Sequence, residues 1–356
     1  MVDPQTIERW RNAPRLTSFS TFFQRTASQE GGVPDIAQPE PDLSLLDFDL
    51  DCAVFAHSHA RLFGGFDGHY YASIPYRLEE QIRLGAGIYS FATRIWARTA
   101  KPATVYTLGA GTGCFIRTLA VLGDGRLKTL CCSATAANRD VFLANRASEH
   151  AHFFFGPFFA LDSERYIADP DLSDFQNGFD ILFEDTTFQM FDRDRVRQLE
   201  FIAPRIKPGG ILLQVQKLAQ QDPLVYDERE WQKDELFKTR YFSRQNISEK
   251  KSEILNTMSD CQVDLPTTVT ALRSFFRYSV VIWNSGNFYT NASSNARSSL
   301  LEFISSLVKP AIPPAYCYEA LPLVLTDTQS EPIAPALAWR RANAVCSSAP
   351  GQRQDC

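Results

Sequence analysis

Several features that would place this 356-residue chain in a particular class are missing from it. No run of apolar residues approaches the roughly 18 that a membrane-spanning helix needs. Residues 1–15 carry charges of both signs and no apolar stretch, which is not the pattern of a signal peptide. The eight cysteines form no C-x-x-C pair, and His57 and His59 have no further ligands at metal-binding spacing. We therefore expect a cytoplasmic protein with reduced cysteines, no membrane span and no metal site.

An excess of basic residues is also missing. The chain has 36 Lys and Arg against 41 Asp and Glu, a formal net charge of −5, and the basic residues are scattered along it. Proteins that bind nucleic acid by neutralising phosphates present a basic face. We therefore expect no nucleic-acid partner. Hydrophobic residues make up 44% of the chain and aromatic residues 12%, which is enough for a packed globular core.

From residue 104 onward, short apolar runs alternate with helical patterns. Five runs are predicted as strands, at 104–108, 128–132, 152–155, 180–183 and 211–216, with helices at 113–122, 136–148 and 193–204 between them. Such alternation predicts a parallel sheet covered by helices on both faces. A helix near 269–276 and two closing strands, 278–283 and about 288–292, complete a doubly wound, seven-stranded α/β sheet.

The segments on either side of this pattern suggest a three-part organisation. Residues 1–98 are expected to form an N-terminal helical extension, ending in an amphipathic helix over 73–97, that covers the ligand crevice as a lid. Residues 99–292 form the core, with a charged helical insertion at 222–260. Residues 293–356 form a C-terminal extension with one helix, 298–307, and a polar end.

The strongest local signal is a glycine-rich turn. Residues 105–113 are Val-Tyr-Thr-Leu-Gly-Ala-Gly-Thr-Gly, a strand that runs into a turn and opens a helix. Glycine permits positive φ and close approach of the backbone to a ligand, and the helix start offers free N–H groups. No Lys-Ser/Thr pair follows Gly113, which excludes a phosphate-binding P-loop. By itself the turn is compatible with a dinucleotide enzyme or with an ordinary tight turn.

A second motif narrows the choice. Residues 207–210 are Lys-Pro-Gly-Gly, followed by the apolar residues 211–213, and the turn between helix and strand that they form resembles that of the class I S-adenosylmethionine (SAM)-dependent methyltransferases. Together with the glycine turn, this resemblance implies a Rossmann-like class I methyltransferase fold with SAM as cofactor. A nicotinamide-dependent enzyme is the alternative for the same fold class.

A closer resemblance extends over about residues 73 to 290. The matching segments follow one another in the order found in the carboxy-SAM synthase family: 73–76, the glycine turn, 187–191, 207–210, 242–243 with 247–251, and 283–288. That family builds a carboxymethyl form of SAM from prephenate, so the resemblance implies that SAM itself can be the substrate. It also assigns Tyr76 to the cofactor site.

The chain departs from that family where the cofactor is usually held. Thr107 stands in place of an acidic residue before the glycine turn, and residues 131–135 lack the carboxylate that grips the ribose. Residues 156–158 are Gly-Pro-Phe where the family has Gly-Asp. Lys251 stands where an Arg would bind the carboxyl group of modified SAM, and a lysine lacks the planar fork of an arginine.

Candidate site residues lie at the predicted carboxyl ends of the strands, where open α/β sheets bind ligands. Asn138 can bind an amine or a ribose hydroxyl, or can satisfy its own helix start. Asp185 is favoured over Glu184 as a base or ammonium ligand, because adjacent strand residues point in opposite directions. Lys217 can hold a carboxylate or lie exposed. The expected catalytic residues are Asn138, Asp185, Thr187, Lys217 and Lys251; the expected cofactor-binding residues are Gly109, Ala110, Gly111, Gly113, Ser133, Thr135, Asn138, Pro157, Phe158, Asp185 and Tyr76.

Two enzymatic readings follow. In the first, the protein is a methyltransferase that acts on a small molecule, which requires proximity and alignment in a dry pocket. In the second, SAM is consumed, either by cyclisation to azetidine-2-carboxylate with release of methylthioadenosine, as in certain peptide-antibiotic pathways of secondary metabolism, or by carboxy-SAM-type modification. A scaffold that has lost catalysis is a third reading. The expected partners are a small molecule or SAM alone, and a homodimer is considered as the oligomeric state.

Overall fold

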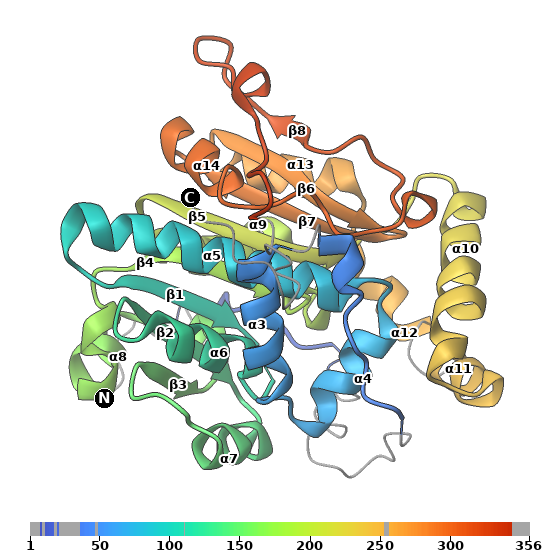
Figure 1. Ribbon diagram of the computed structural model, residues 1–356, viewed down its shortest axis with the longest axis horizontal. Helices are drawn as coiled ribbons and strands as arrows, with labels where there is room; N and C mark the ends of the chain where they lie inside the picture. The colour runs from blue at the N-terminus through green and yellow to red at the C-terminus, as the bar shows by residue number, and fades with distance from the viewer. Residues whose placement is uncertain are drawn as a thin grey trace, which may run out of the picture.

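The computed structural model describes residues 8, 11–17, 20, 36–46, 49–109, 111–252 and 256–343. Within them, one eight-stranded sheet has the order β3-β2-β1-β4-β5-β7-β6-β8 (Figure 1). The strands are β1 Ala103–Leu108, β2 Leu127–Ser133, β3 Ala151–Phe155, β4 Phe179–Asp185, β5 Ile206–Lys217, β6 Tyr278–Ser285, β7 Phe288–Ser294 and β8 Leu323–Thr326.

The pairing confirms the predicted doubly wound α/β fold. β1 to β5 pair in parallel, the order reverses between β1 and β4, and β7 lies antiparallel between β5 and β6. The seven predicted strands are all present, and the sheet has an eighth strand, β8, that was not predicted. β8 pairs antiparallel with β6 at the sheet edge, so the C-terminal extension contributes to the sheet. Its four residues lie between polar and proline-rich stretches, where a short edge strand gives little signal.

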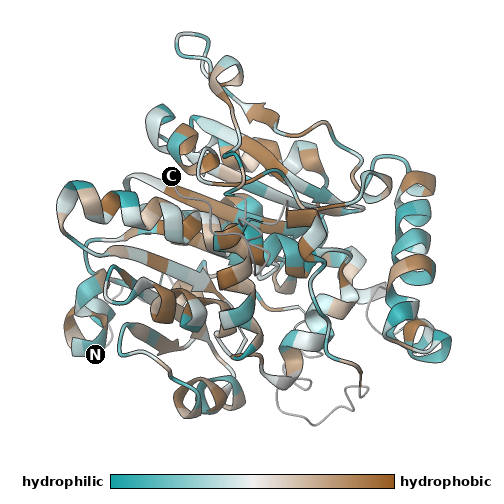
Figure 2. Ribbon diagram, in the orientation of Figure 1, coloured by the Kyte–Doolittle hydropathy of each residue, from teal (hydrophilic) through white to brown (hydrophobic). Residues whose placement is uncertain are grey.

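Helices cover both faces of the sheet. One face packs against α3, α5, α6, α7 and α14, and the other against α9 and α13. Figure 2 shows apolar residues concentrated along the central strands that these layers enclose. The helices of the described residues are α3 Leu50–Ala60, α4 Gly65–Ser73, α5 Arg77–Thr99, α6 Cys114–Gly123, α7 Ala136–Ala144, α8 Ser163–Ala168, α9 Arg195–Ile202, α10 Pro223–Gln232, α11 Arg244–Lys250, α12 Asn256–Met258, α13 Leu265–Arg273 and α14 Arg297–Ile304.

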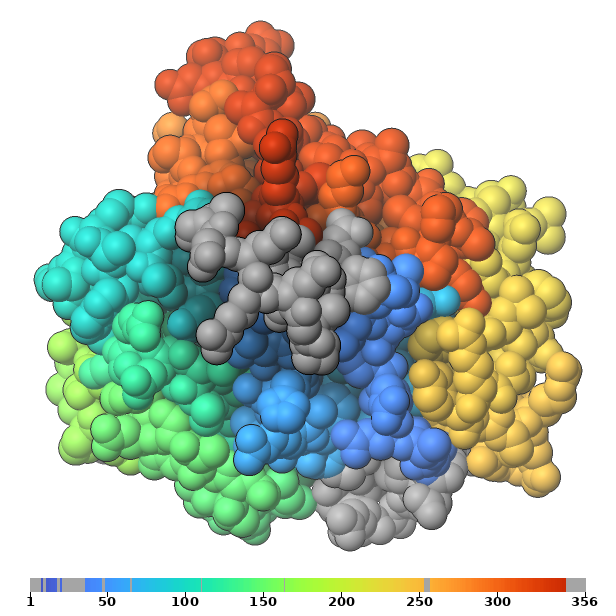
Figure 3. All heavy atoms as spheres, viewed as in Figure 1, coloured from blue at the N-terminus to red at the C-terminus, as the bar shows by residue number. Residues whose placement is uncertain are grey.

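The charged insertion forms one side of the molecule. α10 continues through a π-helical turn, Lys233–Phe237, and a 3-10 turn, Lys238–Arg240, before α11 begins. Figure 3 shows these elements in yellow beside the blue N-terminal helices. Within the described residues, no helix combines the length and the apolar character needed to cross a membrane.

Helix α3 in the N-terminal segment belongs to the main core. Phe55 is 1% exposed and packs with Phe115 of α6, their ring centroids 5.7 Å apart. α5 makes room for this ring at Gly85, where an added Cβ would lie 2.1 Å from Cζ of Phe55. The N-terminal segment therefore helps to build the core.

This packing predicts a large loss of stability in Phe55→Ala. Removing a buried aromatic ring costs about 3–5 kcal/mol of unfolding free energy, because the transfer free energy of the ring is lost and a cavity remains. Urea denaturation would measure the loss. Phe55→Leu, which keeps much of the volume, should cost less than about 1.5 kcal/mol. A loss below about 1 kcal/mol in Phe55→Ala would show that α3 contributes little to the core.

Candidate functional site

A cavity lies at the carboxyl ends of β1, β2, β3 and β4, next to helix α4. This is the edge at which the strand order reverses, the usual position of a ligand in an open α/β sheet. The cavity is lined by Leu16, Ser20, Phe66, Asp67, Tyr70, Tyr71, Gln81, Thr107, Gly109, Gly111, Cys114, Phe115, Cys132, Ser133, Ala134, Thr135, Asn138, Gly156, Pro157, Phe158, Asp185, Thr186, Thr187, Met190 and Phe191.

The glycine turn forms one wall. Gly109 has φ of 54° and Gly111 has φ of 53°, in the left-handed region that favours glycine. A Cβ on Gly109 would lie 2.5 Å from Oγ1 of Thr187, so the turns after β1 and β4 are in close contact. A Cβ on Gly111 would meet nothing within 4 Å, because Gly111 faces open space. α6 begins directly after this turn and directs its positive N-terminal end toward the cavity.

The end of β4 carries two carboxylates that point in opposite directions, as the sequence predicts. Asp185 lines the cavity, where it accepts hydrogen bonds from the Tyr70 hydroxyl and from Nη2 of Arg77, each at 2.7 Å. Glu184 points into the protein and accepts hydrogen bonds from the backbone N–H of Phe188 and from Nε2 of Gln216. Burial raises the pKa of Glu184 to about 7.

Helix α4 supplies four cavity residues that were not predicted from the sequence, and three of them are polar: Asp67, Tyr70 and Tyr71. Oδ2 of Asp67 accepts hydrogen bonds from the backbone N–H of Gly64 at 2.6 Å and from Oγ1 of Thr112 at 3.1 Å. Burial raises the pKa of Asp67 to about 6. The available signal is the spacing of the three residues, which places them on one face of a helix.

Most of the expected site residues reach this cavity. Asn138 donates from Nδ2 to Oγ of Ser133 at 3.1 Å, which fixes the turn after β2. Phe158 both lines the cavity and packs against Phe188 and Phe191, so it serves the core as well as the site. The expected residues that line the cavity are Gly109, Gly111, Ser133, Thr135, Asn138, Pro157, Phe158, Asp185 and Thr187. Ala110 lies outside the described residues.

Four expected site residues do not line the cavity: Gly113, Tyr76, Lys217 and Lys251. Gly113 has φ of 71° and starts α6, and its Cα faces the ring of Phe142. Tyr76 packs between Phe237 and Tyr316. Lys251 is exposed just after the end of α11.

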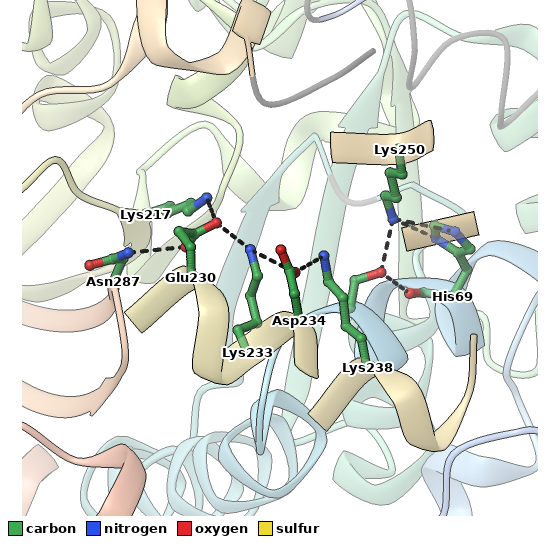
Figure 4. Close-up of polar contacts among 9 residues, drawn as sticks. His69, Lys217, Glu230, Lys233, Asp234, Lys238, Lys250 and Asn287 are labelled. Carbon is green, nitrogen blue, oxygen red and sulfur yellow. Dashed lines mark hydrogen bonds and ion pairs between the residues drawn. The ribbon is translucent and has the colours of Figure 1, made fainter. Parts of the chain in front are cut away.

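Lys217 points into a buried cluster of charges shared with the insertion (Figure 4). Its Nζ lies 2.7 Å from Oε2 of Glu230, to which Lys233 also donates. Nδ2 of Asn287 donates to Oε1 of Glu230 at 3.0 Å, and Lys238 pairs with Asp234 at 2.8 Å. Burial lowers the pKa of Lys217 to about 7. The expected role of Lys217 in holding a ligand carboxylate is therefore not supported by its position.

The charge of the cavity lining constrains the ligand. Among the described residues that line it, the charged side chains are Asp67 and Asp185, and there is no Lys or Arg. A dinucleotide brings a pyrophosphate with two negative charges, for which this lining offers no cationic side chain. The described residues also include no group of three or more His, Cys, Asp or Glu side chains placed to hold a metal ion. The lining favours a ligand that carries positive charge.

Solved structures with similar architecture align with this chain at low sequence identity. No family model matches this chain, and no curated protein matches it. An O-methyltransferase family protein from Burkholderia thailandensis aligns at 16% identity and a TM-score of 0.38, over 55% of this chain and 52% of its own. The plantazolicin methyltransferase BpumL, in complex with a monoazolic desmethylPZN analog and SAH, aligns at 11% identity and a TM-score of 0.44, over 71% of this chain and 98% of its own. The bifunctional kinase-methyltransferase WbdD is matched over 39% of its length, at 13% identity and a TM-score of 0.37. This chain thus spans about half or less of two of these three proteins.

Proposed function

We propose that this chain is a SAM-dependent methyltransferase that acts on a small molecule. One observation carries the proposal: a cavity at the switch point of a doubly wound sheet, beside a glycine turn, whose charged lining side chains are carboxylates. SAM carries a sulfonium and an ammonium against one carboxylate, so its net charge is opposite to that of the lining. A nicotinamide dinucleotide would bring a pyrophosphate, for which the described lining offers no cationic side chain.

The cavity offers a group suited to each part of SAM. The open space at Gly111, beside the N-terminus of α6, would receive the methionine carboxylate. Ser133, Thr135 and Asn138 present hydroxyls and an amide for the ribose, and Phe158 presents a ring for the adenine. Aromatic faces near the cavity also favour the sulfonium. When bound, SAM would supply an electrophilic methyl group.

The residues of this chain would contribute enclosure and orientation. Phe66 of α4 and Met190 and Phe191 after β4 give the cavity apolar walls, which would exclude water from the reacting groups. These features support a small-molecule acceptor.

The carboxy-SAM alternative receives no such support. Lys251, the residue assigned by the resemblance to bind the extra carboxyl group, is exposed and does not line the cavity. None of the described lining residues is a cation that could replace it. Cyclisation of SAM leaves a different product from methyl transfer, and product analysis distinguishes the two.

Product analysis tests the proposal directly. We expect SAM to persist when the purified protein is incubated with it alone, and S-adenosylhomocysteine to form when a panel of small O-, N- and S-nucleophiles is added, because methyl transfer requires an acceptor. Mass spectrometry would identify both nucleoside products, with heat-inactivated protein as the control. Methylthioadenosine above the spontaneous background, formed without an acceptor, would contradict methyl transfer and support cyclisation. Absence of SAM binding in calorimetry would leave only the scaffold reading.

A further inference from the structure

Of the two carboxylates in the cavity, Asp185 is already neutralised. Its Oδ1 accepts the Tyr70 hydroxyl, and its Oδ2 pairs with Arg77, whose side chain is 0% exposed. This pair has no net charge to offer a ligand. Asp67 is therefore the lining carboxylate that remains to be compensated.

The carboxylate of Asp67 is held in place through one of its two oxygens. Both of its hydrogen bonds, from the N–H of Gly64 and the hydroxyl of Thr112, go to Oδ2. No described residue donates to Oδ1, and no described Lys, Arg or His forms an ion pair with Asp67. Arg117 lies near enough to lower its pKa slightly, but that guanidinium donates to two backbone carbonyls. The carboxylate is thus fixed in position through Oδ2, and its Oδ1 accepts from none of the described residues.

The tyrosine beside it is also arranged as an acceptor. Thr118 donates its hydroxyl proton to the carbonyl of Cys114 at 2.9 Å, so its oxygen can only accept from Nδ1 of His59 at 3.0 Å. Neutral His59 then has Nε2 free to accept the Tyr71 hydroxyl at 2.9 Å. Burial lowers the pKa of His59 to about 3, which keeps the ring neutral. The Tyr71 oxygen therefore has only lone pairs left for a ligand.

Two more lining groups lack partners. Oγ1 of Thr107 and Oε1 of Gln81 are buried and have no hydrogen-bond partner among the described residues. Both residues line the cavity, as do Asp67, Tyr70 and Tyr71. The Tyr70 proton is committed to Asp185, so Tyr70 too can only accept. A buried acceptor without a donor is costly, and this wall would be completed by a cationic group with several N–H donors.

We infer that Asp67 of α4 anchors the α-ammonium group of SAM, so that a helix packed over the sheet supplies the carboxylate for the cofactor. The inference rests on the proposed function and deepens it. β1 ends near the same place but offers only the hydroxyl of Thr107. Asp67 contributes one negative charge and SAM a net positive charge, so binding leaves the cavity close to neutral. Through its contact with Asp67, the ammonium group of SAM would thereby hold α4 against the site.

Three ligands with the same adenosine part test this anchor. Calorimetry would measure SAM, S-adenosylhomocysteine, which keeps the amine on a neutral thioether, and methylthioadenosine, a neutral thioether that lacks it, against the wild-type chain and Asp67→Asn. We expect Asp67→Asn to weaken SAM and S-adenosylhomocysteine by about 10- to 100-fold, the range for a lost charged hydrogen bond, and to leave methylthioadenosine within about twofold. Asparagine keeps an oxygen for Gly64 and Thr112, so the loop around it should hold.

The outcomes separate this inference from the proposed function. Wild-type protein that binds none of the three ligands would contradict the proposed function. Wild-type protein that binds SAM, with Asp67→Asn binding it equally well, would contradict the anchor alone. An equal loss for methylthioadenosine would also overturn the anchor, because it would mean a general collapse of the cavity.

Ligand-free stability is a second readout. Because burial raises the pKa of Asp67 from 3.8 to about 6, the carboxylate destabilises the folded protein increasingly between these two pH values and to its full extent above about pH 6. Ligand-free Asp67→Asn should therefore melt about 2–4 °C higher than wild type at pH 7.5, and the difference should shrink at pH 5. A variant that melts lower at pH 7.5 would show that Asp67 serves the fold.

The wild-type chain provides a test that does not depend on folding of the variant. The affinity for S-adenosylhomocysteine relative to methylthioadenosine should fall as the pH drops through about 6, by about 10-fold per unit below it, because Asp67 takes up a proton. A flat ratio between pH 7 and 5 would contradict the anchor.

The charged and titratable groups that face Asp67 are His59 of α3, Tyr71 of α4, Cys114 and Arg117 of α6, and the Asp185–Arg77 pair across the cavity. Burial lowers the pKa of His59 to about 3 and raises those of Tyr71 and Cys114 well above their usual values, so these three do not titrate in this window.

Discussion

Gly111→Asp is expected to lose SAM binding by at least about 100-fold while the protein stays folded. The Cα of Gly111 faces open space, so an added side chain would enter the region where the methionine end of SAM must approach the backbone. The new carboxylate would also repel the carboxylate of SAM at the N-terminus of α6. Calorimetry with SAM, together with circular dichroism to confirm the fold, would measure the effect.

Gly111→Ala is the matched control. Its methyl group would meet no atom within 4 Å, although φ of 53° strains a residue with a Cβ by about 1–2 kcal/mol. We expect a modest loss of stability and a much smaller loss of SAM affinity than in the aspartate variant. Unchanged SAM affinity in Gly111→Asp would remove the glycine turn from the site.

Glu230→Gln is expected to reduce the free energy of unfolding by about 3–5 kcal/mol, the cost of breaking a buried ion pair from one side. The carboxylate accepts hydrogen bonds from Lys217, Lys233 and Asn287, and the two lysines are 1% and 5% exposed. Glutamine would leave their ammonium groups without this counter-ion. Urea denaturation at pH 7 would measure the loss.

The same variant should show a defined pH dependence. Burial lowers the pKa of Lys217 to about 7 even with Glu230 present, and loss of the carboxylate would lower it further. The folded state then binds fewer protons than the unfolded state, so its stability rises with pH. The destabilisation should be largest below pH 7 and smaller toward pH 9, where Lys217 is neutral and needs no partner.

Two further variants check the interpretation of Glu230→Gln. Glu228 lies on the same helix at an exposed position, so Glu228→Gln should change the free energy of unfolding by less than about 0.5 kcal/mol. Adding Lys217→Met to Glu230→Gln should restore part of the lost stability, because it removes a buried amine that has lost its counter-ion. If Glu230→Gln alone costs less than about 1 kcal/mol, the cluster does not hold the insertion on the sheet.

The sheet core and the glycine turn were predictable because their signals are local. Buried parallel strands produce short apolar runs, and β1 has all six residues buried. The turn at Gly109 and Gly111 needs positive φ, which the sequence states directly through glycine. The direction of Asp185 followed from the alternation of side chains along a strand.

Other features were decided by the tertiary structure. Lys217 could be placed at a strand end, but its partner Glu230 lies on α10, in the insertion, and only the packing of that insertion shows where the lysine points. The strand β8 depends on an exposed edge of β6 that four residues near the C-terminus reach. Neither contact has a local signature, because each joins segments whose approach is set by the whole fold.

The carboxylates of the site were also only partly predictable from the sequence. The sequence by itself determined that the sheet edge lacks the usual acidic residues, since Thr107 and Ser133 stand at the ends of β1 and β2. Only the tertiary structure decided that Asp67 lies at this edge. α4 is separated from the glycine turn by the long helix α5, and its position depends on packing through residues such as Tyr71 and His59. Spacing along the chain records the period of a helix, but not the place where that helix docks.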